Sequence, residues 1–149
     1  MAAEARAGAL PPVIGGILEA AIYADDLDAA EAFYGGLLGL RRIARGGNRH
    51  LFYAVGAGVL LIFNPAETEK PPGPGAPPVP VHGARGPGHV CFAVGATELE
   101  AVAQALRQAG QVIEADFRWP EGARSIYLRD PAGNSIEFAD PALWGLAPA

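Results

Sequence analysis

The stretch RSIYLRDPAGNSIEF, from Arg124 to Phe138, is typical of two short strands joined by a turn. Apolar and polar residues alternate on both sides of Asp-Pro-Ala-Gly-Asn, a segment rich in turn-forming residues. One residue interrupts the pattern, because Glu137 places a carboxylate between two apolar residues, Ile136 and Phe138. A buried carboxylate without a partner is costly, so this position needs a physical explanation.

The hairpin pattern occurs twice in the chain. The stretch RHLFYAVGAGVLLIF, Arg49 to Phe63, aligns without a gap to the hairpin that lies 75 positions later. In this alignment Phe52 corresponds to Tyr127, and Ile62 corresponds to Glu137. A strand pattern and a helical pattern also precede each hairpin, so each half predicts the order strand, helix, strand and hairpin.

The repeat predicts an α+β fold in one domain, residues 1–149, built from two βαβββ modules that share one core. Asp25 or Asp26 is expected to cap the first helix, and Thr97 with Glu100 forms a capping box for the second. The expected elements are 17–24, 27–38, 40–44, 49–55 and 58–64 in the first module, and 88–95, 98–109, 111–117, 124–129 and 134–139 in the second. The expected segments are a tail at 1–16, modules at 17–64 and 88–141, a Pro/Gly-rich linker at 65–87 and a tail at 142–149.

Composition narrows the possible settings and partners of the protein. The chain of 149 residues has a formal net charge of −5, which argues against nucleic acid and anionic membranes as partners. Its single cysteine, Cys91, excludes an internal disulfide and favours a reducing, cytoplasmic location. No apolar run approaches the length of a membrane span.

Three polar residues share one predicted feature. Strand alternation places Glu19, His89 and Glu137 on three different strands, all on the face that the helices do not cover. A sheet curved around that face would bring them together, and a divalent cation would neutralise the two carboxylates. Each residue also has an ordinary interpretation: an exposed strand glutamate, a structural histidine and the polar face of a half-exposed strand.

Three stretches of the chain resemble the vicinal oxygen chelate superfamily. These are YADDLDAAEAFYGGLLGL, GHVCFAV and LRDPAGNSIEF, and the resemblance covers about residues 17–141. The superfamily includes glyoxalase I, fosfomycin-resistance proteins, extradiol dioxygenases and bleomycin-resistance proteins. The resemblance implies paired βαβββ modules that form a cupped mixed sheet, with helices on the outer face and a metal ion at its centre.

By position, the resemblance implies that Glu19, His89 and Glu137 are the metal ligands. Many members have histidine or glutamine at the first position, so Glu19 is a variant. The fourth ligand position, which glyoxalase I uses, falls on Ile62, and true glyoxalase I activity is therefore not expected. The implied cofactor is a divalent ion, Mn, Fe or Zn, with coordination positions left open for substrate.

The resemblance further implies a metal-dependent lyase, isomerase, transferase or dioxygenase, whose metal acts as a Lewis acid on a small bidentate oxygenated substrate. One alternative is a metal-free binding protein that sequesters a drug, as in the bleomycin-resistance branch, and another is a ring-cleaving dioxygenase. A homodimer is expected, including one that exchanges modules so that both chains supply ligands.

Further side chains are expected to line the cup. His50 is a candidate for acid–base catalysis, and it is also explained as a histidine at the rim. His82 and Arg85, just before the strand that carries His89, either close over a substrate or belong to a plain linker. The expected substrate-binding residues are Phe52, Ser125, Tyr127 and Arg129.

Overall fold

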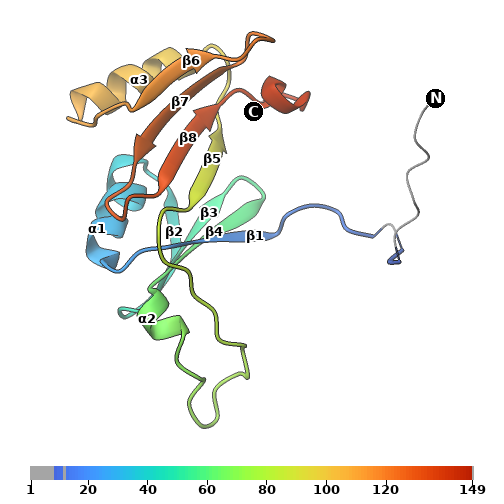
Figure 1. Cartoon of the computed structure of the whole chain (residues 1–149), viewed down its shortest axis with the longest axis vertical. Helices are drawn as coiled ribbons and strands as arrows, with labels where there is room; N and C mark the ends of the chain where they lie inside the picture. Colours follow the sequence, from blue (N-terminus) through green and yellow to red (C-terminus); the bar gives the residue numbers. More distant parts are fainter. Residues whose placement is uncertain (1–8, 12, 149) are drawn as a thin grey trace.

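The computed structural model describes residues 9–11 and 13–148, and in these residues the chain forms two βαβββ modules (Figure 1). The α+β class and the predicted order of elements are confirmed. The first module contains β1 (Glu19–Tyr23), α1 (Leu27–Glu31), the π-helical segment η1 (Ala32–Leu37), β2 (Arg41–Gly46), β3 (His50–Val55) and β4 (Gly58–Phe63). After a short helix α2 (Pro65–Thr68), the second contains β5 (His89–Ala93), α3 (Leu99–Gln108), β6 (Ala115–Arg118), β7 (Arg124–Arg129) and β8 (Ser135–Ala139), and a 3-10 turn η2 (Pro141–Trp144) follows.

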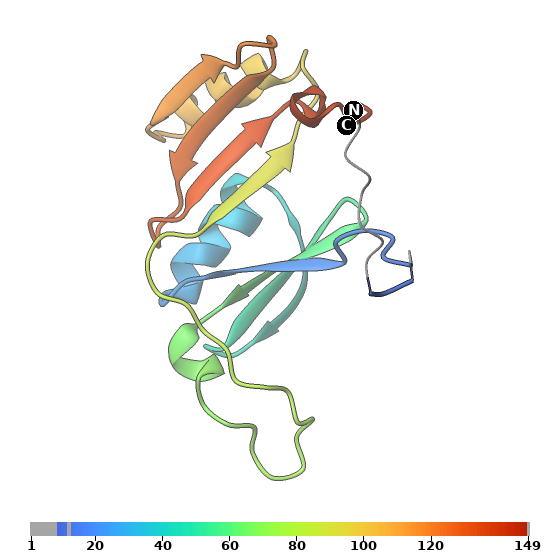
Figure 2. The same ribbon diagram turned by 45° about the vertical axis from the view of Figure 1, so that its right-hand side comes forward.

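Each module has its own mixed sheet of four strands. The strand orders are β1-β4-β3-β2 and β5-β8-β7-β6, with β1 parallel to β4 and β5 parallel to β8. The edge strands β1 and β5 approach at one end, where the Asn134 side chain donates a hydrogen bond of 3.0 Å to the carbonyl of Tyr23. From there the two strands diverge (Figures 1 and 2). Among the described residues, each of these strands is therefore paired along only one edge.

The two modules share one hydrophobic core, as the repeat predicts for halves of this size. Apolar residues that alternate along the strands face the helices, and the residues between them face away. Strand alternation places Leu18, the neighbour of Glu19, on the helix-facing side, but Leu18 lies beyond the covered part of the sheet and is 75% exposed. The fully buried core residues include Leu27, Tyr34, Leu51, Tyr53, Ile62, Leu99, Ala103, Ile126, Leu128 and Ile136.

The helix starts agree only in part with the sequence-based expectation. Asp26 caps α1, since its carboxylate accepts a hydrogen bond of 3.0 Å from the backbone N–H of Ala29. The prediction for the second helix was wrong: Glu98 occupies the capping position of α3, and its side chain makes no capping hydrogen bond. The first helix also widens into η1, where the backbone N–H of Leu38 bonds to the carbonyl of Phe33, five residues earlier.

The strand register corrects the gapless alignment of the two hairpins. Phe52 lies opposite Leu61 in the first hairpin, whereas Tyr127 lies opposite Glu137 in the second. Because Phe52 and Tyr127 are equivalent, Leu61 and not Ile62 occupies the position of Glu137. The connection between β7 and β8 is longer than the tight β3–β4 turn, which shifts the last strand by one residue. Ile62 points into the helix-facing core and is 0% exposed.

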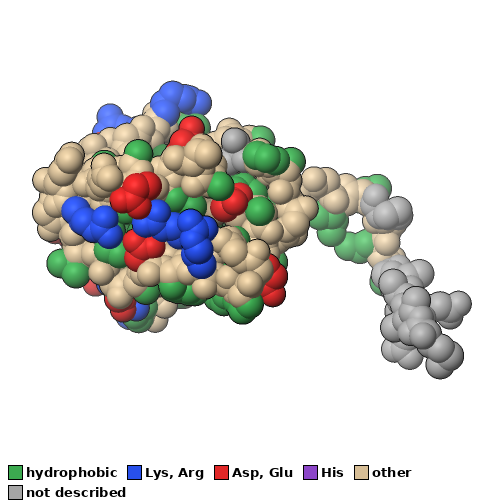
Figure 3. Space-filling view, turned by 90° about the horizontal axis from the view of Figure 1, so that it is seen from above, with side chains coloured by type: hydrophobic (Ala, Val, Ile, Leu, Met, Phe, Trp, Pro, Cys, Tyr) green, Lys and Arg blue, Asp and Glu red, His purple; other side chains and the backbone are tan. Residues whose placement is uncertain are grey.

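The segments outside the modules also differ from expectation. The predicted linker contains α2, which Asn64 caps by accepting a hydrogen bond of 3.1 Å from the N–H of Ala66. The strand predicted at 111–117 starts only at Ala115. Before β1, an extended segment projects from the body, with hydrophobic side chains along it (Figure 3). No helix in the described part of the chain has the length and apolar character needed to cross a membrane.

Candidate metal centre

Two of the three predicted ligands lie next to each other on the adjacent strands β5 and β8. The Nε2 atom of His89 is 3.3 Å from the Oε2 atom of Glu137. Glu137 is buried, with 5% of its surface exposed, and its Oε1 atom has no hydrogen-bond partner among the described residues. The His89 side chain is 51% exposed, so the pair is accessible from the open face of the sheet.

The hydrogen bond of the other ring nitrogen defines the chemistry of His89. Its Nδ1 atom lies 3.0 Å from the carbonyl oxygen of Ser135, which can only accept, so Nδ1 carries the proton. In the neutral imidazole, Nε2 then presents a lone pair toward the Glu137 carboxylate. Two acceptors that face each other require a proton or a cation between them.

These donors fit a divalent metal ion. A lone pair on Nε2 and a carboxylate are ordinary ligands of Zn, Fe and Mn, and the carbonyl behind Nδ1 orients the ring as in many metal sites. The buried Oε1 of Glu137, which lacks a partner among the described residues, would also be satisfied by a cation. A metal bound here would be held by His89 and Glu137, with further positions left for other ligands.

Glu19 lies apart from this pair. It stands on the free edge strand β1, is exposed and lies opposite Val59 of β4. Within the described part of a single chain, no three His, Cys, Asp or Glu side chains come together as a possible metal site. The structure thus brings two of the three predicted ligands together and leaves the third on a different sheet.

Aromatic side chains form a wall beside the His89–Glu137 pair on the open face of the second sheet. The ring of Tyr127 stacks on Phe117, with centroids 5.9 Å apart, and lies 6.3 Å from the ring of His89. Burial and the neighbouring Glu137 carboxylate raise the pKa of Tyr127 to about 12. Its hydroxyl therefore keeps its proton at neutral pH and can donate a hydrogen bond.

Two other predicted substrate-binding residues are already engaged. Ser125 is buried, and its hydroxyl accepts a hydrogen bond of 2.8 Å from the indole N–H of Trp119. Arg129 donates to both carboxylate oxygens of Glu114, at 2.6 and 3.1 Å. Phe117 was not predicted from the sequence as a residue of the open face. Strand alternation places it there once β6 has its observed bounds, Ala115–Arg118.

The predicted residues of the first module line a separate open face. His50 stacks on Phe52 with ring centroids 4.3 Å apart, and its ring lies against the backbone of Gly46, where an added Cβ would be 2.3 Å from the ring. Burial, and then the charge of Arg49, lower the pKa of His50. The ring is therefore neutral at pH 7, and in this chain it is surrounded by packing contacts.

The segment before β5 is also anchored. His82 Nδ1 and the hydroxyl of Tyr23 are 2.8 Å apart, and the His82 ring packs edge-on against Phe63. Arg85 is paired with Glu69, which lies just after α2. In the single chain, His82 therefore holds the linker against the first module, and the Arg85–Glu69 pair joins the two ends of the linker.

A mixed sheet in each of two βαβββ modules, with a histidine–carboxylate pair on an open face, defines a class of α+β proteins built from paired βαβββ modules. The family comparison agrees: the chain belongs to the Glyoxalase/Bleomycin resistance protein/Dioxygenase superfamily, whose model matches residues 16–138. Members of this superfamily generally use a divalent metal ion and bind small-molecule substrates. No curated protein sequence matches the chain significantly.

Solved structures of the superfamily are similar over most of the chain. A lactoylglutathione lyase from Agrobacterium tumefaciens is 40% identical, with a TM-score of 0.84, over 92% of this chain and 100% of that one. A glyoxalase/dioxygenase from Nostoc punctiforme is 20% identical, with a TM-score of 0.65, over 92% and 99%. A putative glyoxalase family protein from Bacillus anthracis is 21% identical, with a TM-score of 0.66, over 88% and 98%. The last two show likeness of fold alone.

Proposed function

We propose that the protein is a metal-dependent enzyme that binds a small bidentate oxygenated substrate through a divalent ion held by Glu19, His89 and Glu137. The observation that carries this proposal is the buried Glu137 carboxylate. Its Oε1 has no partner in the part of the chain that the structure describes, and its Oε2 faces the lone pair of His89. A cation at this point satisfies both groups at once.

The proposed site is completed by a second copy of the chain, which supplies Glu19. In one chain the edge strands β1 and β5 diverge, so Glu19 cannot join His89 and Glu137. One edge of β1 is unpaired among the described residues, and the apolar residues before it are exposed, Ile17 at 83% and Leu18 at 75%. An unpaired edge beside exposed apolar residues is typical of a protein–protein interface. In a homodimer in which β1 of one chain lies beside β5 of the other, this surface is buried. The three ligands then come together at two equivalent sites, one for each chain.

When bound, the metal would act as a Lewis acid that polarises the substrate oxygens. Glu137 and His89 would hold it from one chain, and the hydrogen bond of His89 to the Ser135 carbonyl limits reorganisation of the imidazole ring. The protonated Tyr127 hydroxyl would donate a hydrogen bond to negative charge that develops on the substrate. Phe117 and Phe52 would form apolar walls that exclude water.

The test of this proposal is metal content. The dialysed protein, reconstituted separately with Mn, Fe and Zn, should bind one ion per chain, and Glu137→Gln should lose it because too few charged ligands remain. Glu114→Gln is the matched control, since that exposed glutamate pairs with Arg129 away from the proposed ligands. Wild type without metal after all three reconstitutions, or Glu137→Gln with a full complement, contradicts the proposal.

A second candidate reaction is isomerisation of a glutathione hemithioacetal, which the similarity to the Agrobacterium lactoylglutathione lyase favours. Against it stands Leu61, which occupies the fourth ligand position and can neither bind a metal nor move a proton. Loss of a general base costs about 10² to 10⁴ in rate, so turnover of methylglyoxal with glutathione should be feeble. A rate of roughly 10 per second would establish this reaction instead.

The metal-free and metal-loaded forms of the protein also distinguish the proposed enzyme from two other functions. A metal-free binding protein of the bleomycin-resistance type would bind a cationic drug equally well before and after removal of metal. A ring-cleaving dioxygenase would consume oxygen with catechols when loaded with iron. The proposed enzyme predicts neither result.

A further inference from the structure

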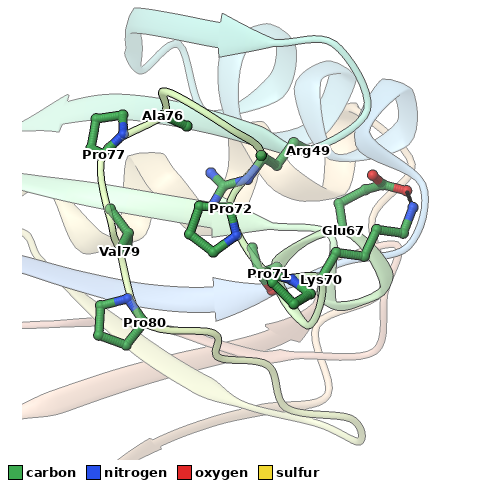
Figure 4. A pocket seen from close by; sticks show the side chains of 11 residues that line it. Arg49, Glu67, Lys70, Pro71, Pro72, Ala76, Pro77, Val79 and Pro80 are labelled. Atoms are coloured by element: carbon green, nitrogen blue, oxygen red, sulfur yellow. Dashed lines mark hydrogen bonds and ion pairs between the residues drawn. The ribbon is translucent and has the colours of Figure 1, made fainter.

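A proline-walled cavity lies at the end of the first module, outside the His89–Glu137 pair. Its volume is about 480 Å³, and the segment that follows α2 encloses it. Pro71, Pro72, Pro77 and Pro80 form most of its wall, and proline fixes the backbone that surrounds it. The four pyrrolidine rings restrict the backbone at their own positions, so this part of the wall is less adaptable than one made of long side chains. Figure 4 shows the guanidinium of Arg49 directed over Pro72, inside the ring formed by this segment.

Arg49 differs from the other arginines of the chain. In the described residues, Arg41, Arg49 and Arg118 form no ion pair with a carboxylate, and of these three only Arg49 is half-buried. Its side chain reaches Nδ1 of His50 at 3.3 Å and lies 5.7 Å from the centre of the Phe63 ring. A guanidinium carries five N–H donors, so most of them remain free to meet a ligand in the cavity.

The charges around the cavity favour a monoanion. Lys70 is neutralised by Glu67, with 2.8 Å between Nζ and Oε1, and both line the cavity. Arg49 therefore leaves one net positive charge in a protein whose formal charge is −5. One unpaired positive charge balances one negative charge, so the site suits a monoanion better than a phosphate dianion. The apolar walls favour a ligand with an apolar body.

We propose that this cavity binds a small organic monocarboxylate, whose carboxylate pairs with Arg49 and whose apolar body lies against the proline wall. Arg49 matches carboxylates because its fork of donors can bind both oxygens. Phe63 and His50 fix the guanidinium on one side, which lowers the entropy lost on binding. The site is separate from the proposed metal site, and its ligand is a separate small molecule.

The experiment is a titration of the full-length, metal-free protein with phenylacetate, followed by calorimetry and by backbone amide NMR. Phenylacetate should bind one per chain with a dissociation constant of about 1 mM or tighter. The largest chemical-shift changes should fall on Arg49, Phe63 and residues 65–80. Reloading the protein with zinc should leave this affinity unchanged.

Three variants make the test specific. Arg49→Met should weaken binding about tenfold or more, because it removes the charged partner. Arg118→Met, which removes an exposed arginine of the second module that forms no ion pair, should change nothing. Val79→Trp fills the cavity from a position that is 50% exposed, and it should abolish binding without a risk to the core.

Several results would overturn the proposal. They are the absence of binding at roughly 10 mM phenylacetate, unchanged affinity in Val79→Trp, or shift changes centred on His89 and Glu137. Tighter binding of inorganic phosphate than of phenylacetate would likewise contradict a monocarboxylate site. If Arg49→Met fails to fold, Val79→Trp alone decides the outcome, because it retains every charged group.

Discussion

The hydroxyl of Tyr34 in η1 donates a hydrogen bond of 2.6 Å to Oδ2 of Asp130, in the turn between β7 and β8. The two residues are 96 positions apart and belong to different modules. Burial, together with the Asp130 carboxylate, raises the pKa of Tyr34, so its proton stays in this bond. The same turn carries Asn134, whose side chain bonds both Asp130 and the carbonyl of Tyr23. This clamp holds the modules of one chain back to back.

The clamp should contribute strongly to stability. Tyr34→Phe removes one hydroxyl and leaves the buried Asp130 carboxylate short of a donor, so the free energy of unfolding should fall by about 1–3 kcal/mol. Tyr23→Phe is the matched control, because its bond to His82 is only partly buried and its loss should cost less. Urea denaturation measures both. Equal losses would mean that the Tyr34–Asp130 bond has no special role.

Mixing two inactive variants should restore metal binding if the site spans two chains. Glu19→Gln and Glu137→Gln each remove one ligand from every site of their own homodimer. In a mixed dimer, one site receives both changes and the other receives neither. Refolding an equal mixture should therefore recover about one quarter of the wild-type metal content, by random assortment of chains. A mixture as empty as its two parents would place the ligands within one chain.

The corrected register predicts opposite effects for neighbouring substitutions. Leu61→Glu adds a carboxylate on the open face beside β1, so it should tighten metal binding in the dimer. Ile62→Glu places a charge in the helix-facing core and should destabilise the protein by about 3 kcal/mol or more. Metal affinity and thermal unfolding separate the two. Tighter metal binding by Ile62→Glu would restore the gapless alignment.

His50 should titrate below the ordinary range of histidine. Burial and Arg49 lower its pKa, so the unfolded chain binds this proton before the folded protein does. Stability should consequently decrease as the pH falls below about 6.5, the pKa of the unfolded side chain. Ring NMR signals report the pKa directly. Arg49→Met should move it upward, though not to the ordinary value, since burial is the larger cause; a downward or absent shift would contradict this assignment.

Much of the fold follows from local patterns in the sequence. Alternation along the strands predicts which side chains face the helices, and the repeat predicts two modules with one core. It also brings His89 and Glu137 to the same face, where the structure finds them 3.3 Å apart. These features depend on periodicity and on pairing between neighbouring strands, which a short stretch of sequence contains.

Other features depend on contacts that no local pattern records. The one-residue register difference between Ile62 and Leu61 arises from the longer β7–β8 connection, which a gapless match of residue types hides. The separation of Glu19 from His89 arises from the angle between modules. The modules are joined by their shared core and by Tyr34, Asp130 and Asn134, polar residues whose partners lie far away in the chain. Thr97 failed as a cap because α3 begins later, at Leu99.

The back-to-back arrangement of the modules, which the Tyr34–Asp130 clamp helps to hold, also controls whether the proposed assembly closes as a dimer. Pairing the first module of one chain with the second module of another is a head-to-tail contact, and such contacts close into a ring or continue as a filament. Closure at two chains requires a particular angle between the modules of each chain. A substitution that changes this angle without unfolding either module would therefore leave half-sites unmatched at each end and lengthen the dimer into a polymer.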